Sequence, residues 1–197
     1  MHELAVLTAV VVAIMAVTTV VAGLVGRTLL VIENILVGAA VLVALFVMAF
    51  VGAEVGMRYL FNAPIPGHLE GAELLMPMIV FLALSYTQAT HGHVGMDLVL
   101  DMLPPRGRRF ATMATLLVSI FICSILAYFS SKNALQLWNY DDVTMSPPYF
   151  KTWPSAAAIG LGYILVSIRM YVQLLHLYKP DRFPANEPRD SGFHAVE

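Results

Sequence analysis

Two side chains of opposite charge lie within an otherwise apolar stretch of the sequence. Glu54 and Arg58 are four residues apart, so on a helix they share one face and can form an ion pair. Charges inside a membrane are costly, which makes such residues candidates for function. A self-compensating intramembrane ion pair is the favoured interpretation, because the partner is within reach near the end of the stretch. A contact with another subunit or a proton site is the alternative.

Two further acids follow a proline-rich turn. Glu70 and Glu73 come directly after Pro64-Ile65-Pro66-Gly67, where proline cannot continue a helix. The acids therefore mark the start of a new helix, where the positive end of the helix dipole stabilises carboxylates. A capping role of this kind and recognition of a partner subunit both remain open.

Three histidines allow a hypothesis of a different class. His91 and His93 end one apolar stretch and His176 ends another, so a bis-histidine haem site in a small cytochrome b-like anchor is the alternative function. Their place at the membrane edge, where imidazole is ordinarily solvated, disfavours it. The sequence has no HExxH, GxGxxG or Walker A motif, so we expect no enzyme activity, metal or cofactor. The single cysteine, Cys123, is interpreted as small apolar filler.

The composition places these residues in a membrane protein. Apolar residues make up 59% of the 197 residues, charged residues only 12%, and the mean hydropathy is +0.77. A soluble domain carries about twice this share of charge. The net charge of −2 gives no reason to expect nucleic-acid binding.

Five apolar stretches approach the ~20 residues that a helix needs to cross a bilayer. They cover residues 4–26, 35–57, 74–90, 110–128 and 156–175. The predicted fold is an all-α integral membrane protein, a bundle of five transmembrane helices. Its predicted parts are an extra N-terminal helix (1–27), a four-helix membrane domain (28–178) and a mobile cytoplasmic tail (179–197). The first stretch lacks a basic start and is longer than a usual signal-peptide core, which favours a retained helix over a cleaved signal.

The segments between these stretches predict contacts with the membrane surface. Residues 94–103 have the pattern of a short amphipathic helix at the cytoplasmic surface. Directly after it come three cations that we expect to anchor the next helix to anionic lipid: Arg106, Arg108 and Arg109. Trp138 and Trp153 bracket another loop and are expected in an interfacial belt, with an aromatic substrate platform as the alternative.

The distribution of basic residues predicts the orientation. Of the eleven lysines and arginines, seven fall on one side of the five stretches, three on the other, and Arg169 within the last stretch. The richer side is expected in the cytoplasm, which puts the N-terminus in the periplasm and the C-terminus in the cytoplasm. Small residues four apart, at Gly52 and Gly56 and at Ala156 and Gly160, are suited to close helix packing.

Several short segments, taken in order, resemble a known family. They are RYLFNAPI at 58–65, ELL at 73–75, FLA at 81–83, HVGMDLVLDMLP at 93–104, and the Ser-Pro and Trp-Pro pairs at 146–147 and 153–154. Their order and spacing resemble the small membrane subunit (DctQ-like) of tripartite ATP-independent periplasmic (TRAP) transporters. The resemblance covers about residues 28–177, and the extra first helix is a departure from the usual four.

The resemblance implies an accessory role in transport. The small subunit of this family pairs with a large (DctM-like) membrane subunit, which carries the substrate and sodium sites and moves as an elevator. A periplasmic binding protein delivers a carboxylate or sulfonate. We therefore expect a scaffold subunit of a sodium-coupled importer in a bacterial inner membrane, against the further alternative of a structural membrane protein without a transport role. Arg58, Glu70 and Glu73 surround one outer turn and are predicted to contact the large subunit or the binding protein.

Overall fold

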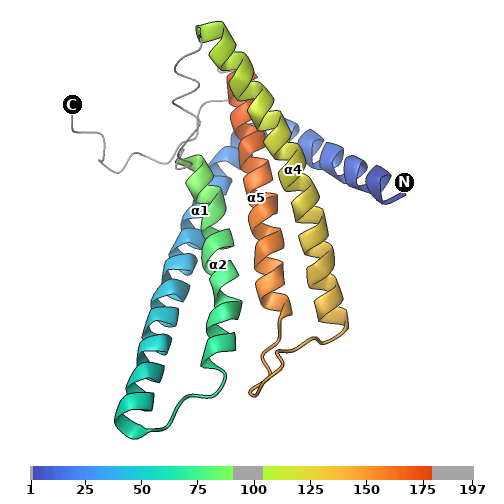
Figure 1. The fold of residues 1–197 in the computed structure, drawn as a ribbon. Coiled ribbons are helices and arrows are strands. Elements are labelled where there is room, and N and C mark those ends of the chain that lie inside the picture. Colours follow the sequence, from blue (N-terminus) through green and yellow to red (C-terminus); the bar gives the residue numbers. More distant parts are fainter. Residues whose placement is uncertain (1, 91–103, 179–197) are drawn as a thin grey trace, which may run out of the picture.

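The structure is an all-helical bundle whose helices alternate in direction (Figure 1). The computed structural model describes residues 2–90 and 104–178, with side chains from Thr28 onward except those of Pro105 and Arg106. The helices are α1 (His2–Phe61), α2 (His68–Ala89), α4 (Pro105–Asn139) and α5 (Trp153–Tyr178). The connections α1–α2 and α4–α5 lie at the same end of the bundle. We call this the outer end and the opposite one the inner end, after the predicted orientation.

Helix α1 occupies the N-terminal half of the described chain. The sequence predicted two helices separated near Arg27; residues 2–61 form one helical element of 60 residues, whose N-terminal part runs in a different direction from the rest (Figure 1). Residues 27–34 are more polar than their surroundings and contain neither proline nor glycine, so nothing in them interrupts the helical hydrogen bonds. In Figure 1 the N-terminal part of α1 runs away from the bundle, while the remainder lies beside α2.

Four helices of the described residues are long and apolar enough to cross a membrane. They are Thr28–Phe61, His68–Ala89, Gly107–Asn139 and Trp153–Tyr178. The prediction of an all-α membrane bundle is confirmed to this extent, and a separate fifth helix is not among the described residues. The predicted surface helix at 94–103 and the tail from residue 179 lie outside them.

Helix α5 lies at the centre of the bundle and packs against α4 and α2 through small residues. Gly160 and Gly162 are buried, and a Cβ atom on them would lie 2.9 Å from Ser131 Oγ and 2.5 Å from the Phe81 carbonyl oxygen, respectively. The Phe81 ring then contacts the Tyr163 ring at a centroid distance of 5.0 Å. These helices approach closely because the glycines leave room for the neighbouring backbone.

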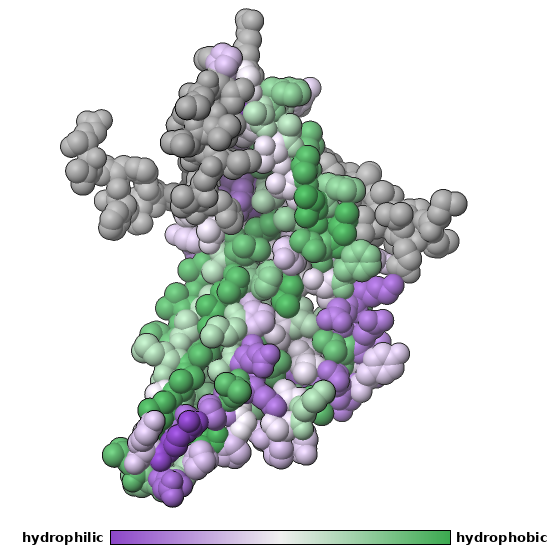
Figure 2. Space-filling view, in the orientation of Figure 1, coloured by the Kyte–Doolittle hydropathy of each residue, from purple (hydrophilic) through white to green (hydrophobic). Residues whose placement is uncertain are grey.

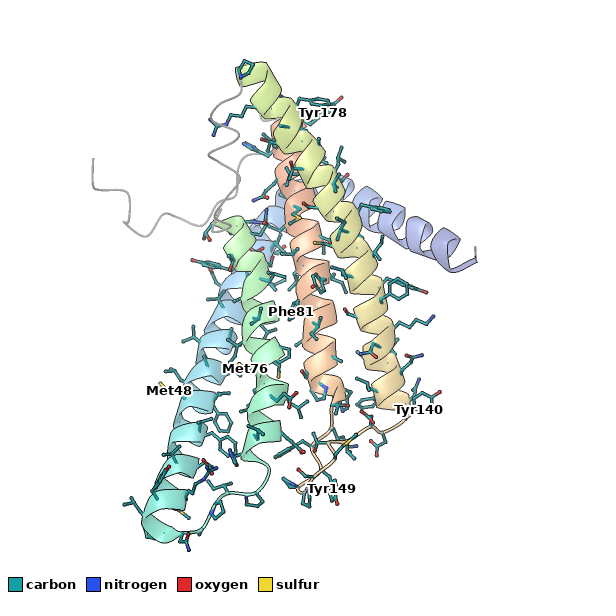
Figure 3. All side chains as sticks on the ribbon, in the orientation of Figure 1. Met48, Met76, Phe81, Tyr140, Tyr149 and Tyr178 are labelled. Atoms are coloured by element: carbon teal, nitrogen blue, oxygen red, sulfur yellow. The ribbon has the colours of Figure 1, made fainter. Side chains whose placement is uncertain are left out.

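The described side chains of α1, from Thr28 to Phe61, include only a narrow line of buried residues. Glu33, Ala40, Val47 and Glu54 are buried at intervals of seven residues, the repeat of a coiled-coil seam. Most of the rest of its surface is apolar and exposed, and Figure 2 shows hydrophobic side chains along it. Met48, 68% exposed, points away from α2 (Figure 3).

The two outer connections contact each other. Helix α1 ends before Asn62, which has a positive φ of 51°, and α2 begins after Gly67, with φ 73°. A Cβ atom on Gly67 would lie 2.3 Å from Cδ of Pro148 in the α4–α5 connection. The positive φ and the close approach of Pro148 both require glycine at this position. The absence of a side chain lets the two connections form one outer surface.

Candidate subunit interface and its polar contacts

The ion pair between Glu54 and Arg58 occupies the outer end of α1. Arg58 Nε donates a hydrogen bond of 2.9 Å to Glu54 Oε1. The Glu54 side chain is only 3% exposed, whereas that of Arg58 is 51% exposed. The helical i, i+4 spacing thus lets a surface guanidinium neutralise a carboxylate that faces α2.

His68, the first residue of α2, contacts the same carboxylate. Its Nδ1 lies 2.9 Å from the Ile65 carbonyl oxygen and its Nε2 lies 3.7 Å from Glu54 Oε1. A carbonyl oxygen only accepts hydrogen bonds, so Nδ1 carries the proton of this contact. The second contact is ionic when the ring is protonated.

Glu70 joins the first turn of α2 to the α4–α5 connection. Its Oε1 accepts hydrogen bonds from the backbone N–H of Ser146, at 3.2 Å, and from Ser146 Oγ, at 2.5 Å. Glu73, one helical turn further on, is exposed. Of the three residues predicted as contacts for other subunits, Arg58 and Glu70 therefore bond within this chain, and Glu73 presents its carboxylate to the surroundings.

The α4–α5 connection is a folded loop with an apolar tip. Val143 and Lys151 form an isolated antiparallel bridge, and Lys151 Nζ lies 2.7 Å from Asp141 Oδ1. Met145 is 99% exposed. Tyr149, labelled at the outer end in Figure 3, is 56% exposed. An exposed apolar tip on a hydrogen-bonded loop is suited to contact with another protein.

The two tryptophans at the base of this loop contact each other. The rings of Trp138 and Trp153 meet edge to face at a centroid distance of 4.6 Å. Trp138 is 57% exposed, in keeping with the amphipathic ring expected at a membrane interface.

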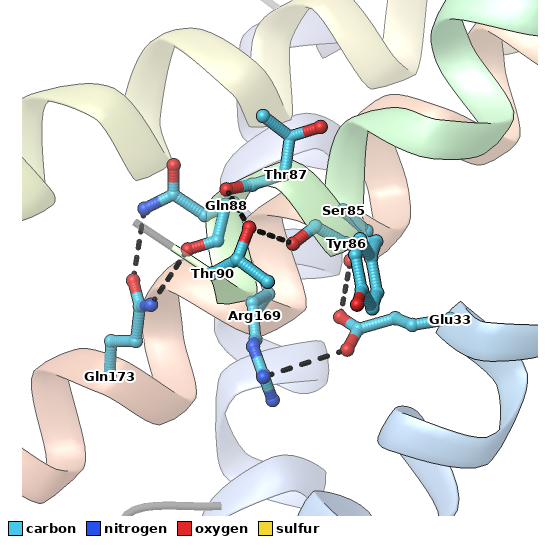
Figure 4. A network of polar contacts seen from close by, with 8 residues as sticks. All are labelled: Glu33, Ser85, Tyr86, Thr87, Gln88, Thr90, Arg169 and Gln173. Carbon is cyan, nitrogen blue, oxygen red and sulfur yellow. Dashed lines mark hydrogen bonds and ion pairs between the residues drawn. The ribbon is translucent and has the colours of Figure 1, made fainter. Parts of the chain in front are cut away.

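A buried polar contact at the inner half of the bundle joins three helices (Figure 4). Ser85 Oγ of α2 donates a hydrogen bond of 2.5 Å to Glu33 Oε1 of α1, and Arg169 Nη2 of α5 lies 3.6 Å from Glu33 Oε2. Nearby, Gln88 Nε2 donates to Gln173 Oε1 at 2.9 Å, and Gln173 Nε2 donates to the Gln88 carbonyl oxygen at 3.1 Å. Both contacts use side chains to connect helices that are distant in sequence.

Sequence reasoning missed Glu33. This residue falls between the predicted apolar stretches 4–26 and 35–57, and Arg169 was placed within the last stretch with no partner named. The signal was available, since an ionisable residue within a membrane helix often pairs with one of opposite charge. In the structure the acid that Arg169 meets is Glu33.

The remaining predicted site residues lie at the inner end. Arg109 Nη2 donates to the carbonyl oxygen of Leu177, at 2.5 Å, and so connects the start of α4 to the end of α5. Arg108 is exposed, and the side chain of Arg106 lies outside the described residues. His176 is in the last turn of α5, whereas both histidines proposed to share a haem with it lie outside the described residues. Among the residues with described side chains, no three His, Cys, Asp or Glu gather as a metal site.

Comparison with known proteins decides the family. The family described as "Tripartite ATP-independent periplasmic transporters, DctQ component" matches residues 47–179. The chain belongs to the DctQ family. The predicted resemblance is thereby confirmed, and this family is one of transporter components rather than of enzymes.

A curated relative supports the assignment. The chain is 35% identical over 88 residues to the C4-dicarboxylate TRAP transporter small permease protein DctQ of Vibrio cholerae. The aligned part covers 45% of this chain and 35% of the relative, so the chain spans about a third of that protein's length.

The DctQ match has a defined place in the fold. It begins at Val47, on the buried line of α1, and continues through the outer connections to the end of α5. It therefore includes the Glu54–Arg58 pair, Glu70 and Arg169. Glu33 and the N-terminal part of α1 precede it.

Proposed function

We propose that this DctQ protein is the scaffold subunit of a TRAP transporter, importing an organic acid together with sodium. In this function it stabilises a large elevator-type membrane subunit and supplies part of the docking surface for a periplasmic binding protein. It handles neither substrate nor ion. The curated relative is named for C4-dicarboxylates, which supports a carboxylate as the substrate class.

The observation that carries this proposal is the outward face of α1. Residues at alternating intervals of four and three form a second seam, opposite the buried one: Gly38, Leu42, Leu45, Ala49, Gly52 and Gly56. Leu42 and Leu45 are 68% and 51% exposed. A Cβ atom on any of the three glycines would meet nothing within 4 Å. We call these six residues the outward seam.

Such a seam fits a helix of another subunit. In lipid, helices associate through close packing rather than through the hydrophobic effect, and small residues at heptad spacing permit it. The glycines of α5 contact neighbours in this chain, whereas those of the outward seam are open. The large subunit is the partner that the DctQ family provides for this face.

The outer end supports contact with the binding protein. Glu73, near the start of α2, and the apolar tip of the α4–α5 loop, with Met145 and Tyr149, are exposed, and the α1–α2 and α4–α5 connections lie at the same end of the bundle (Figure 1). If the basic residues at the inner end face the cytoplasm, this surface faces the periplasm. The substitution of Glu73 and Met145 is then expected to weaken docking without weakening subunit assembly.

Co-purification tests the proposal. Replacing Gly52 by leucine fills the outward seam and should reduce recovery of the large subunit at least several-fold, while the melting temperature of the isolated small subunit does not fall. Thr115→Leu adds bulk on an exposed position of α4 and should leave recovery unchanged. Full recovery with Gly52→Leu would place the interface elsewhere and contradict this proposal.

A further inference from the structure

We propose that Glu33, Ser85 and Arg169 form a buried lock that fixes the inner parts of α1, α2 and α5 in one register. The lock lies six residues after Arg27, close to where the N-terminal part of α1 leaves the bundle (Figure 1). The inference is independent of the proposed scaffold function.

Each of the three helices contributes one side chain to the lock. Glu33 is 0% exposed, Ser85 is 1% exposed and Arg169 is 2% exposed. One carboxylate oxygen of Glu33 accepts the Ser85 hydroxyl at 2.5 Å, and the other lies 3.6 Å from the Arg169 guanidinium (Figure 4). The carboxylate thus divides its two oxygens between two neighbouring helices.

Because the contact is buried, it favours one position of α1 along and around its axis relative to α2 and α5. An ion removed from water is tolerated only when its partner is in place, and loss of one partner leaves an uncompensated charge. Shifting a helix by one residue moves a side chain by ~1.5 Å along the axis and by ~100° around it. Such a shift of α1 would turn Glu33 away from both partners. The present register is therefore the one in which both charges are neutralised.

The neighbouring pair of amide side chains, Gln88 and Gln173, cannot fix the register of α1. Gln88 and Gln173 join α2 to α5 only. The lock adds α1, whose other buried residues on this seam between Glu33 and Glu54 are apolar, namely Ala40 and Val47. Apolar contacts of this kind tolerate small rotations more readily than a buried ion pair does.

Spin-label distances test the lock in the full chain. In a Cys123→Ala background, labels at the exposed positions Ile35 and Tyr178 report the inner parts of α1 and α5, and labels at Val55 and Leu161 report the outer parts. We expect Glu33→Gln to broaden the inner distance distribution and to leave the outer one unchanged. An unchanged inner distribution would overturn the proposal. Gln88→Leu, which disturbs only the amide pair, should leave both unchanged.

Coupling between the two charges gives a second readout. Glu33→Gln and Arg169→Met should each lower the melting temperature by about 6 °C or more. The double variant should recover at least half of the summed loss, because it removes both members of the Glu33–Arg169 ion pair. Strictly additive losses would contradict the lock. If either single variant fails to fold, Ser85→Ala removes one hydrogen bond only. It should still broaden the inner distance distribution, and an unchanged width would also overturn the proposal.

Discussion

At the scale of the residue, burial decides what each ion pair contributes. Glu54 is buried, so its carboxylate depends on Arg58, whereas Asp141 and Lys151 are both exposed to solvent. Arg58→Ala is expected to lower the free energy of unfolding by about 1–3 kcal/mol, because it leaves a buried acceptor without its charged donor. Lys151→Ala should change it little, since exposed pairs are screened. Thermal melts of the two variants in detergent check this, and equal losses would contradict it.

Hydrogen bonding distinguishes Glu70 from Glu73, two acids for which the sequence supported the same prediction. Glu70 accepts two hydrogen bonds from Ser146, whereas Glu73 is exposed. Glu70→Ala should therefore release the α4–α5 loop and increase hydrogen exchange at residues 140–152 several-fold. Glu73→Ala should leave exchange there unchanged. Equal exchange in both variants would show that Glu70 does not hold the loop.

At the scale of the element, the helix glycines are of two kinds. Some lie against a neighbouring helix of this chain, and others have no atom of this chain close to the position of a Cβ atom. A Cβ atom on Gly162 would lie 2.5 Å from the Phe81 carbonyl oxygen, whereas one on Gly52 would meet nothing within 4 Å. Gly162→Ala is expected to destabilise the isolated subunit by about 1–3 kcal/mol through overpacking. Gly52→Ala should stabilise it by up to ~1 kcal/mol, because alanine favours the helix. Unfolding measurements on the two variants check these opposite signs.

Helix α1 also shows what the sequence could and could not predict. Its apolar stretches were predicted from composition, because a long run of apolar residues suits the membrane however the helices pack. The sequence did not predict that the helix continues through Arg27, because a short polar segment like residues 27–34 occurs both in loops and within helices. The pairing of Glu33 with Arg169 requires that this helix begin before Glu33, whereas the predicted stretch began at residue 35. The partner of Glu70 lies 76 residues away in a loop, where the sequence pattern gives no pairing signal.

At the scale of the whole molecule, the buried acids of the described residues pair within the chain. Glu33 and Glu54 each bond to another residue of the bundle, and the broad outward face of Thr28–Phe61 is apolar. This distribution suits a subunit that holds a neighbour in place.

Reconstitution tests this account most directly. Proteoliposomes should contain this chain alone, the large subunit alone, or both, each with the binding protein, a sodium gradient and a labelled C4-dicarboxylate. We predict uptake only when both membrane subunits are present, and none with this chain alone. Sodium-dependent uptake by this chain without the large subunit would contradict the proposed function.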